Sequence, residues 1–290
     1  MLIQDLYRKI FTTWFDEYQN ETRYGIKGKL IITEQSNYQK ITIIETKKYG
    51  KALLLDNCWM TTEKEEKSYH ESLVHPALST AKEIRKVLII GGGDGGAVRE
   101  CLLYNEVKHL DLVEIDNRVI ELCQEYLPSL GGIAWEDPRL NIKIKDGVKW
   151  VMEAKDQSYD VIIVDGSDPK GPALGLFNKE FFQNCHRILK TGGVFATQSE
   201  SPKTFLNIHL EMLTIIRQIF KYAEPLYGNV PIYPSGYWSW IFATKDKPRY
   251  LEPIPQRTEG IKTEFNIWSI NWQRHAFKAM PAYLEKLINK

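Results

Sequence analysis

The chain has 290 residues, 43% of them hydrophobic, which suits one large domain, or a small domain and a large one, with a sizeable core. Its 38 lysines and arginines are balanced by 37 aspartates and glutamates. We therefore expect no overall electrostatic attraction to nucleic acid or to an anionic membrane. The first residues lack the apolar core of a signal peptide, and no apolar run reaches the ~18 residues that span a bilayer, so we expect a cytoplasmic protein.

The first 65 residues are rich in short β-like runs. Candidate strands cover 29–33, 40–45 and 51–55, with turn residues at Tyr49-Gly50 and Asp56-Asn57. From about residue 66, apolar strands alternate with helices, which indicates a Rossmann-like, mostly parallel, doubly wound α/β sheet. We therefore predict an N-terminal β domain over 1–65 and a Rossmann-like domain over 66–290, packed tightly because no Pro- or Gly-rich linker joins them. The strands expected in the second domain are 87–90, 109–114, 140–144, 160–165, 192–198 and 237–243.

The most informative motif is the loop 91–96, Gly-Gly-Gly-Asp-Gly-Gly, which follows a buried strand and precedes a helix. It satisfies G-x-G-x-x-G, the nucleotide-binding fingerprint, and the next strand ends at Glu114, about 20 residues on, where a ribose-binding acid is expected. Asp94 inside this loop disfavours a pyrophosphate and suits a ligand with a cationic arm. A competing interpretation makes Asp94 a turn or helix-capping residue.

Acidic residues collect at the ends of four successive predicted strands. Ligands of open parallel sheets bind beyond the carboxyl ends of the strands, so these side chains should share one pocket. Clustered carboxylates repel one another unless a metal or an organic cation neutralises them. Magnesium prefers sites with substrate phosphates, which Asp94 discourages, so a polyamine or a sulfonium nucleoside fits better. The five acids are Asp94, Glu114, Asp146, Asp165 and Asp168.

Aromatic residues accompany these acids. Tyr69 stands at the start of the α/β part, and Tyr233 and Trp238 belong to an aromatic turn near the carboxyl end. Methylenes of an alkylammonium chain can lie on such rings while its nitrogens meet acids or π faces. For Trp240 we expect ordinary core packing instead. The four cysteines and six histidines lack metal-ligand spacing, which favours reduced thiols and no metal site.

These motifs together resemble those of the polyamine aminopropyltransferases, the spermidine synthase family, over nearly the whole chain. Members of this family move the aminopropyl group of decarboxylated S-adenosylmethionine to a diamine and release methylthioadenosine. The most specific stretch is 165–177, Asp-Gly-Ser-Asp-Pro-Lys-Gly-Pro-Ala-Leu-Gly-Leu-Phe. The other matching motifs are Trp14-Phe15, 36–39, Tyr69-His70-Glu71, 91–96, Val113-Glu114-Ile115-Asp116, Asp146-Gly147, Tyr233-Pro234-Ser235-Gly236, and His275, Phe277 and Pro281 in the tail.

The resemblance implies a role for each of these residues. Asp165 would be the base that takes a proton from the attacking amine, which Tyr69 would hold, and Asp168, Tyr233 and Trp238 would bind the acceptor. Donor-binding residues would be His70 and Asp94 for the aminopropyl end, Glu114 for the ribose, Asp146 and Gly147 for the adenine, and Gln39 and Pro172 for the rest of the nucleoside site. The donor is a co-substrate, so no cofactor is implied.

Departures from the family pattern leave the acceptor open. Gly166 lies where a hydroxyl residue is usual, and Trp59 and Met60 replace an aliphatic residue and a pocket glutamine. We expect putrescine as acceptor; agmatine, cadaverine and spermidine are the alternatives. An S-adenosylmethionine-dependent amine methyltransferase is the competing enzyme, but Asp94 would repel the carboxylate of that donor. An NAD-dependent oxidoreductase would give Asp165 no role. A protein that only binds polyamines as a sensor would have no need of a base such as Asp165.

The family also commonly forms dimers or tetramers through its β-rich part, so we expect a homo-oligomer. The aromatic segment Trp14, Phe15 and Tyr18 would suit such a contact, or could instead cap the chain's own core.

Overall fold

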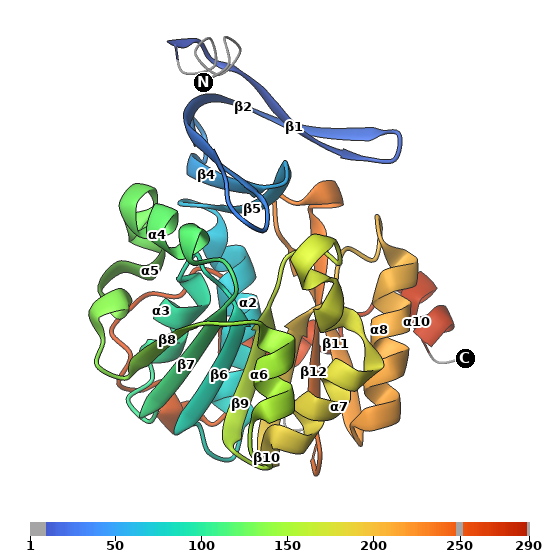
Figure 1. The fold of residues 1–290 in the computed structure, drawn as a ribbon. Coiled ribbons are helices and arrows are strands. Elements are labelled where there is room, and N and C mark those ends of the chain that lie inside the picture. Colours follow the sequence, from blue (N-terminus) through green and yellow to red (C-terminus); the bar gives the residue numbers. More distant parts are fainter. Residues whose placement is uncertain (1–9, 248–251, 289–290) are drawn as a thin grey trace.

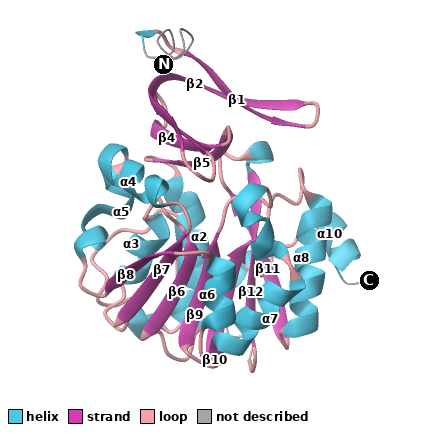
Figure 2. Cartoon of the chain, viewed as in Figure 1, coloured by secondary structure: helices cyan, strands magenta, loops and turns pink. Residues whose placement is uncertain are grey.

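The computed structural model describes residues 10–247 and 252–288, which form two β-sheets (Figure 1). A small antiparallel sheet near the N-terminus lies across one end of a larger sheet that is covered by helices on both faces (Figure 2). The small sheet runs in sequence order through β1 (Thr13–Gln19), β2 (Thr22–Gln35), β3 (Lys40–Thr46), β4 (Gly50–Leu55) and β5 (Cys58–Thr62).

The larger sheet has seven strands in the order β11-β12-β10-β9-β6-β7-β8. Five of them are parallel, and β12 joins β10 antiparallel. Within this sheet the chain first forms the central strand β6 and then adds β7 and β8 on one side. It next crosses to the other side of β6, where it adds β9. The bounds are β6 (Lys86–Gly91), β7 (His109–Glu114), β8 (Leu140–Ile144), β9 (Tyr159–Asp165), β10 (Leu189–Gln198), β11 (Tyr222–Asn229) and β12 (Tyr237–Thr244).

Helices cover both faces because the central strands bury almost every residue. Ile89 and Ile163 belong to the core cluster that includes α2 (Glu66–Thr80) and α3 (Gly96–Leu102), whereas their neighbours Leu88 and Ile162 pack with the cluster of α7 (Lys179–Ile188) and α8 (Leu206–Ile219). This is the continuous apolar pattern of strands buried on both faces. The remaining helices are α4 (Asn117–Tyr126), α5 (Pro128–Gly131), α6 (Gly147–Glu153), α9 (Ile270–Ala276), α10 (Ala282–Ile288), and 3₁₀ turns at Gly132–Glu136, Gly171–Phe177, Pro234–Gly236 and Pro255–Arg257.

The fold class expected from the sequence is confirmed, as are the six strands expected in the large sheet, with ends shifted by a few residues. Three strands were not predicted: β1, β5 and β11. Strand β11 contains Pro225 and Gly228, which read as strand breakers, but it lies at the edge of the sheet, where a proline removes no necessary hydrogen bond. The small sheet ends at Thr62, and α2 begins at Glu66.

The side chains of β1 divide between the core and the surface. Phe15 is buried, whereas Trp14 and Tyr18 are 52% and 66% exposed, as alternation along a strand requires. The segment therefore caps the chain's own core through Phe15 and presents two aromatic rings outward. Trp240 lies fully buried in the core, as predicted, and the four cysteines are free thiols. In the part of the chain that the structure describes, the helices are too short or too polar to cross a membrane.

Candidate active site

A cavity opens at the carboxyl ends of β6 and β9, where the order of the strands along the sheet reverses. It encloses about 910 Å³ of empty space, part of it open to solvent. Its floor is formed by the glycine loop and the ends of β6, β7 and β9, and Leu53, Leu55 and Met60 of the small sheet contribute to its wall. The cavity is thus built by both sheets, and ligands of doubly wound folds bind at such a switch point.

The glycines of the loop allow the strands to come together at this point. Gly91 has a φ of +78°, and a Cβ there would stand 2.3 Å from the carbonyl oxygen of Asp165. Gly92 donates its N–H to the same carbonyl at 2.9 Å. A larger residue at position 91 would push β9 away, so the glycine fixes where the Asp165 side chain enters the cavity.

A histidine and two acids meet on the floor of this cavity. The Nε2 atom of His70, on α2, lies 3.4 Å from Asp94 and 3.9 Å from Asp165, and its Nδ1 atom lies 2.7 Å from Glu66. Burial alone would lower the pKa of His70, but Asp94 and Glu66 outweigh it and hold this pKa well above its usual value. The ring is therefore an imidazolium facing two carboxylates.

Asp94 also performs the local role considered for it. One carboxylate oxygen accepts the N–H of Gly96 at 2.8 Å at the start of α3, while the other faces His70. Burial raises the pKa of Asp94, but the imidazolium of His70 more than offsets this and leaves it below the usual value. Asp94 therefore has the turn role, whereas the N-cap of α3 is Gly95, and the second oxygen of Asp94 stays directed at the cavity floor.

Asp165 is the least satisfied acid of the site. Its Oδ2 atom is buried and has no hydrogen-bond partner among the described residues. Burial raises the pKa of Asp165 to about 6, an effect that His70 opposes and Asp94 reinforces, and the hydroxyl of Tyr69 donates to the carboxylate. The group is ionised above neutral pH and has a free oxygen, so it can accept a proton.

Glu114 ends β7 and lines the cavity. Its Oε1 atom accepts the N–H of Asp116 at 2.9 Å, and burial raises its pKa to about 7. Asp116 in turn accepts hydrogen bonds from Gln39 at 3.1 Å and from Ser36 at 2.6 Å, which ties the small sheet to the end of β7. Asp146 lines the same cavity and caps α6 by accepting the N–H of Val148 at 2.8 Å.

A second, smaller pocket adjoins the cavity. It is narrow and shares Met60, Tyr69 and Tyr233 with the larger one. Tyr233 packs edge-on against Tyr69 and Trp238, with ring centroids 5.7 and 4.5 Å apart, and donates its hydroxyl to the carbonyl of Met60 at 2.7 Å. The other residues lining this pocket include Glu17, Trp59, Asp168, Gln198 and Phe205.

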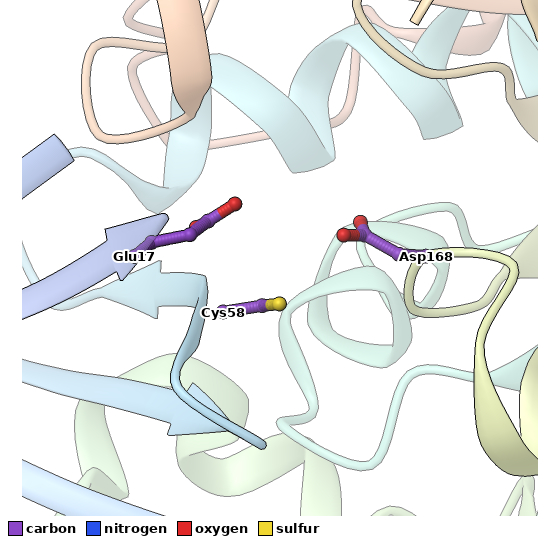
Figure 3. Close-up of side chains that lie close together, drawn as sticks. All are labelled: Glu17, Cys58 and Asp168. Carbon is purple, nitrogen blue, oxygen red and sulfur yellow. The ribbon is translucent and has the colours of Figure 1, made fainter. Parts of the chain in front are cut away.

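Three possible metal ligands converge beside this pocket. Figure 3 shows Glu17, Cys58 and Asp168 pointing toward one another from β1, β5 and the loop after β9, with ligand atoms within 4.8 Å. Burial raises the pKa of the Cys58 thiol to about 12, and the two acids add to this, so the thiol is protonated when no cation is bound. His70, Asp94 and Asp165 form a second group of the same kind. Both groups were missed by spacing rules because their members are far apart in sequence.

The residues singled out from the sequence come together in these two pockets. The larger one contains Gln39, Tyr69, His70, Asp94, Glu114, Asp146, Gly147, Asp165 and Tyr233, and the smaller one contains Tyr69, Asp168, Tyr233 and Trp238. The side chain of Pro172 lies outside the described residues. Glu17 and Gln198 were not predicted. Gln198 could have been found, because it ends a strand that was predicted and the carboxyl ends of parallel strands border the site.

Comparisons with known proteins agree with this geometry. The model of the spermidine synthase tetramerisation domain matches residues 13–63, and that of the spermine/spermidine synthase domain matches residues 66–251. A polyamine aminopropyltransferase of the bacterium Prochlorococcus marinus is 62% identical over 278 residues, covering 96% of this chain and 97% of the relative. Another, from strain MIT 9313 of the same species, is 58% identical over 273 residues, covering 94% and 96%.

Two solved structures are similar over the whole fold. A spermidine synthase in complex with the transition-state analogue AdoDATO has a TM-score of 0.91 at 34% identity, covering 96% of this chain and 95% of that one. The spermidine synthase from Thermotoga maritima has a TM-score of 0.90 at 32% identity, covering 100% and 99%. The resemblance expected from the motifs is thereby confirmed, and this chain belongs to the spermine/spermidine synthase family of polyamine aminopropyltransferases and is an aminopropyl-transferring enzyme.

Proposed function

We propose that this enzyme transfers the aminopropyl group of decarboxylated S-adenosylmethionine to putrescine, giving spermidine and methylthioadenosine. The observation that carries the proposal is the junction of the two pockets. Tyr69 lines both of them and hydrogen-bonds Asp165, so a donor in the larger pocket and an amine in the smaller one would meet at an acid with a free oxygen.

The donor fits the larger pocket by charge. Glu114 would accept the ribose hydroxyls, and Gln39, Asp146, Gly147 and Pro172 would complete the nucleoside site. The aminopropyl ammonium would lie near Asp94, with His70 beside it. The carboxylate of ordinary S-adenosylmethionine would face the same acid and be repelled, which favours the decarboxylated donor.

The chemistry then needs little more than geometry and a base. The amine nitrogen attacks the carbon next to the sulfonium, the carbon–sulfur bond breaks, and its electron pair stays on sulfur as neutral methylthioadenosine. Asp165 takes the proton that the amine loses, because an ammonium has no lone pair with which to attack. A sulfonium leaves readily, so we propose that the reaction uses neither a cofactor nor a metal, and that positioning supplies much of the rate.

The smaller pocket favours a short diamine. Its aromatic wall of Trp59, Tyr233 and Trp238 suits a methylene chain, and Asp168 would receive the distal ammonium, close to buried Glu17. A four-carbon diamine would span this wall with one ammonium at each end, whereas the longer, triply charged spermidine would have to fit past the indole rings of Trp59 and Trp238. Met60 replaces the family's usual glutamine, so the attacking amine would depend on Tyr69 and Asp165 for its polar contacts.

We also propose that the enzyme is a homo-oligomer assembled through its N-terminal sheet, since residues 13–63 match a tetramerisation model. The exposed rings of Trp14 and Tyr18 lie on this sheet and would be covered by a second copy.

A panel of amines tests the acceptor. With decarboxylated S-adenosylmethionine as donor, methylthioadenosine release should have its highest kcat/KM with putrescine, a lower value with cadaverine, and much lower values with agmatine and spermidine. A higher kcat/KM for spermidine or agmatine would refute putrescine as the acceptor while leaving aminopropyl transfer intact.

A further inference from the structure

The glycine loop of the larger pocket rests against a tryptophan that lies outside both pockets. Trp135 belongs to the 3₁₀ turn Gly132–Glu136, and its half-buried indole packs against the core cluster that includes α2 and α3. A Cβ on Gly95 would stand only 2.3 Å from Cζ2 of Trp135, so the ring lies directly on the backbone of the loop. The indole lines neither of the two pockets described above, so it acts on a ligand there only through the loop.

We propose that Trp135 is a positioning residue, which fixes the turn at Gly95 and thereby places Asp94 for the aminopropyl ammonium of the donor. The inference rests on the donor-binding role proposed above for Asp94. It adds a residue that controls the affinity for the donor without touching it.

The turn leaves the Asp94 side chain little freedom of its own. Gly95 donates its N–H to the carbonyl of Gly92 at 3.0 Å, and Gly92 donates its own to the carbonyl of Asp165 at 2.9 Å. One carboxylate oxygen of Asp94 accepts the N–H of Gly96 at 2.8 Å, so the side chain is tied to the backbone that follows it. A shift of the backbone at Gly95 therefore moves the Asp94 carboxylate relative to the end of β9.

Gly95 needs a support from outside the loop. Its φ of +87° and ψ of −3° are left-handed, and glycine has more backbone freedom than any other residue, so its own preferences do not hold the turn. Two rings hold it instead. The indole of Trp135 lies on Gly95, and the imidazole of His70 lies on the next residue, where a Cβ on Gly96 would stand 2.2 Å from Cε1.

The indole is kept at this position at a cost. Its Nε1 atom is buried and has no hydrogen-bond partner within residues 10–247 and 252–288. An unsatisfied buried donor is destabilising, and a phenylalanine would fill much of the same space without it. The phenyl ring is shorter than an indole, however, and Cζ2 and Cε2 are the atoms of Trp135 that meet Gly95. The contact with the loop is therefore what the larger ring adds.

A second glycine allows the indole to be displaced without being removed. A Cβ on Gly131, at the end of α5, would stand 2.2 Å from Nε1 of Trp135. The backbone of Gly131 has φ −85° and ψ −28°, a right-handed helical conformation that alanine adopts without strain. Gly131→Ala should therefore push the indole from its place while leaving its own backbone relaxed.

The test is a double-mutant cycle between positions 131 and 135, followed by steady-state kinetics. Trp135→Ala should raise the KM for decarboxylated S-adenosylmethionine about tenfold, because small displacements of a positioned group are costly. The KM for putrescine should stay within about twofold, since the acceptor pocket is untouched. Gly131→Ala should raise the donor KM in the same way. In the Trp135→Ala background it should have no further effect, because the ring that it displaces is absent.

A matched control separates positioning from stability. Trp272, on α9, is another half-buried indole of the same core cluster, and it lines neither pocket. Trp272→Ala should lower the temperature of thermal unfolding and leave both KM values unchanged. Calorimetry with methylthioadenosine, which lacks the aminopropyl group, should show a smaller loss of affinity in Trp135→Ala than calorimetry with decarboxylated S-adenosylmethionine.

Three results would overturn the proposal. The first is an unchanged donor KM in Trp135→Ala or, where that variant fails to fold, in Gly131→Ala. The second is a rise in donor KM from Gly131→Ala that is as large without the indole as with it. The third is an equal loss of affinity for both nucleosides, which would mean that Trp135 does not act through Asp94. A donor KM that is unchanged in Asp94→Asn would instead refute the proposed role of Asp94 itself.

Discussion

Replacing Glu114 with glutamine should weaken the binding of methylthioadenosine and remove the pH dependence of that binding. Burial raises the pKa of Glu114 from 4.5 to about 7. A carboxylate that accepts two ribose hydroxyls must be ionised, so the nucleoside binds the deprotonated form. Binding below pH 7 therefore releases a proton, and the affinity of the unchanged enzyme should rise with pH.

The expected changes in Kd follow from the raised pKa of Glu114 and from the hydrogen bonds that its carboxylate would make to the ribose. At pH 6 about one molecule in ten carries an ionised Glu114, so the Kd should be ~10-fold weaker than at pH 8. The charge-assisted hydrogen bonds lost in Glu114→Gln are together worth about 1.5–3 kcal/mol, which is ~10- to 150-fold in Kd at pH 8. At pH 6 the variant should differ only several-fold, because the unchanged enzyme must first give up its proton.

Isothermal titration calorimetry in buffers of different ionisation enthalpy measures both the Kd and the protons released. Glu114→Gln should release none. The variant should also fold normally, because an acid with a raised pKa stabilises the folded state below pH 4.5 and loses that contribution between pH 4.5 and 7, ~3 kcal/mol for this shift. Thermal unfolding at pH 8 should show a variant at least as stable as the unchanged enzyme. An unchanged Kd at pH 8 would mean that the ribose binds elsewhere.

Two other substitutions separate donor from acceptor binding. Asp94→Asn should raise the KM for decarboxylated S-adenosylmethionine about tenfold or more and narrow the discrimination against S-adenosylmethionine, because the repelling charge is lost; equal use of both donors by the unchanged enzyme would contradict this. Asp168→Asn should raise the KM for putrescine more than it lowers kcat, since the contact that is removed lies away from the reacting nitrogen. Steady-state kinetics with each substrate varied measures both constants. A loss of kcat alone would show that Asp168 does not anchor the acceptor.

The fold could largely be predicted because its signals are local. The glycine loop, the apolar strands and the alternation with helices each lie within a few consecutive residues, and together they indicated the switch point and most strands. Strand β11 was not predicted because Pro225 argues against a strand when only neighbouring residues are considered. A proline is tolerated in a strand at the edge of a sheet, and that position is known only from the tertiary structure.

The residues of the candidate site were likewise predicted only in part. Acids at strand ends were found because parallel strands bring their carboxyl ends to one edge of the sheet. Glu17 and the partnership of Cys58 with Asp168 were not found, because they depend on how the small sheet lies across that edge. The charge of His70 was also beyond the sequence, since it depends on Glu66 and Asp94 approaching opposite sides of one ring.

The most direct test of the account is the pH dependence of turnover in Asp165→Asn. The asparagine keeps the shape of the side chain but accepts no proton, so we predict that kcat falls ~10²–10⁴-fold near neutral pH and partly recovers at high pH, where more of the diamine arrives uncharged. The unchanged enzyme should lose activity on acidification with a midpoint near the Asp165 pKa of about 6. Near-normal kcat in Asp165→Asn, with the turnover defect and its pH rescue found in Asp168→Asn instead, would contradict the assignment of Asp165 as the base at the junction of the two pockets.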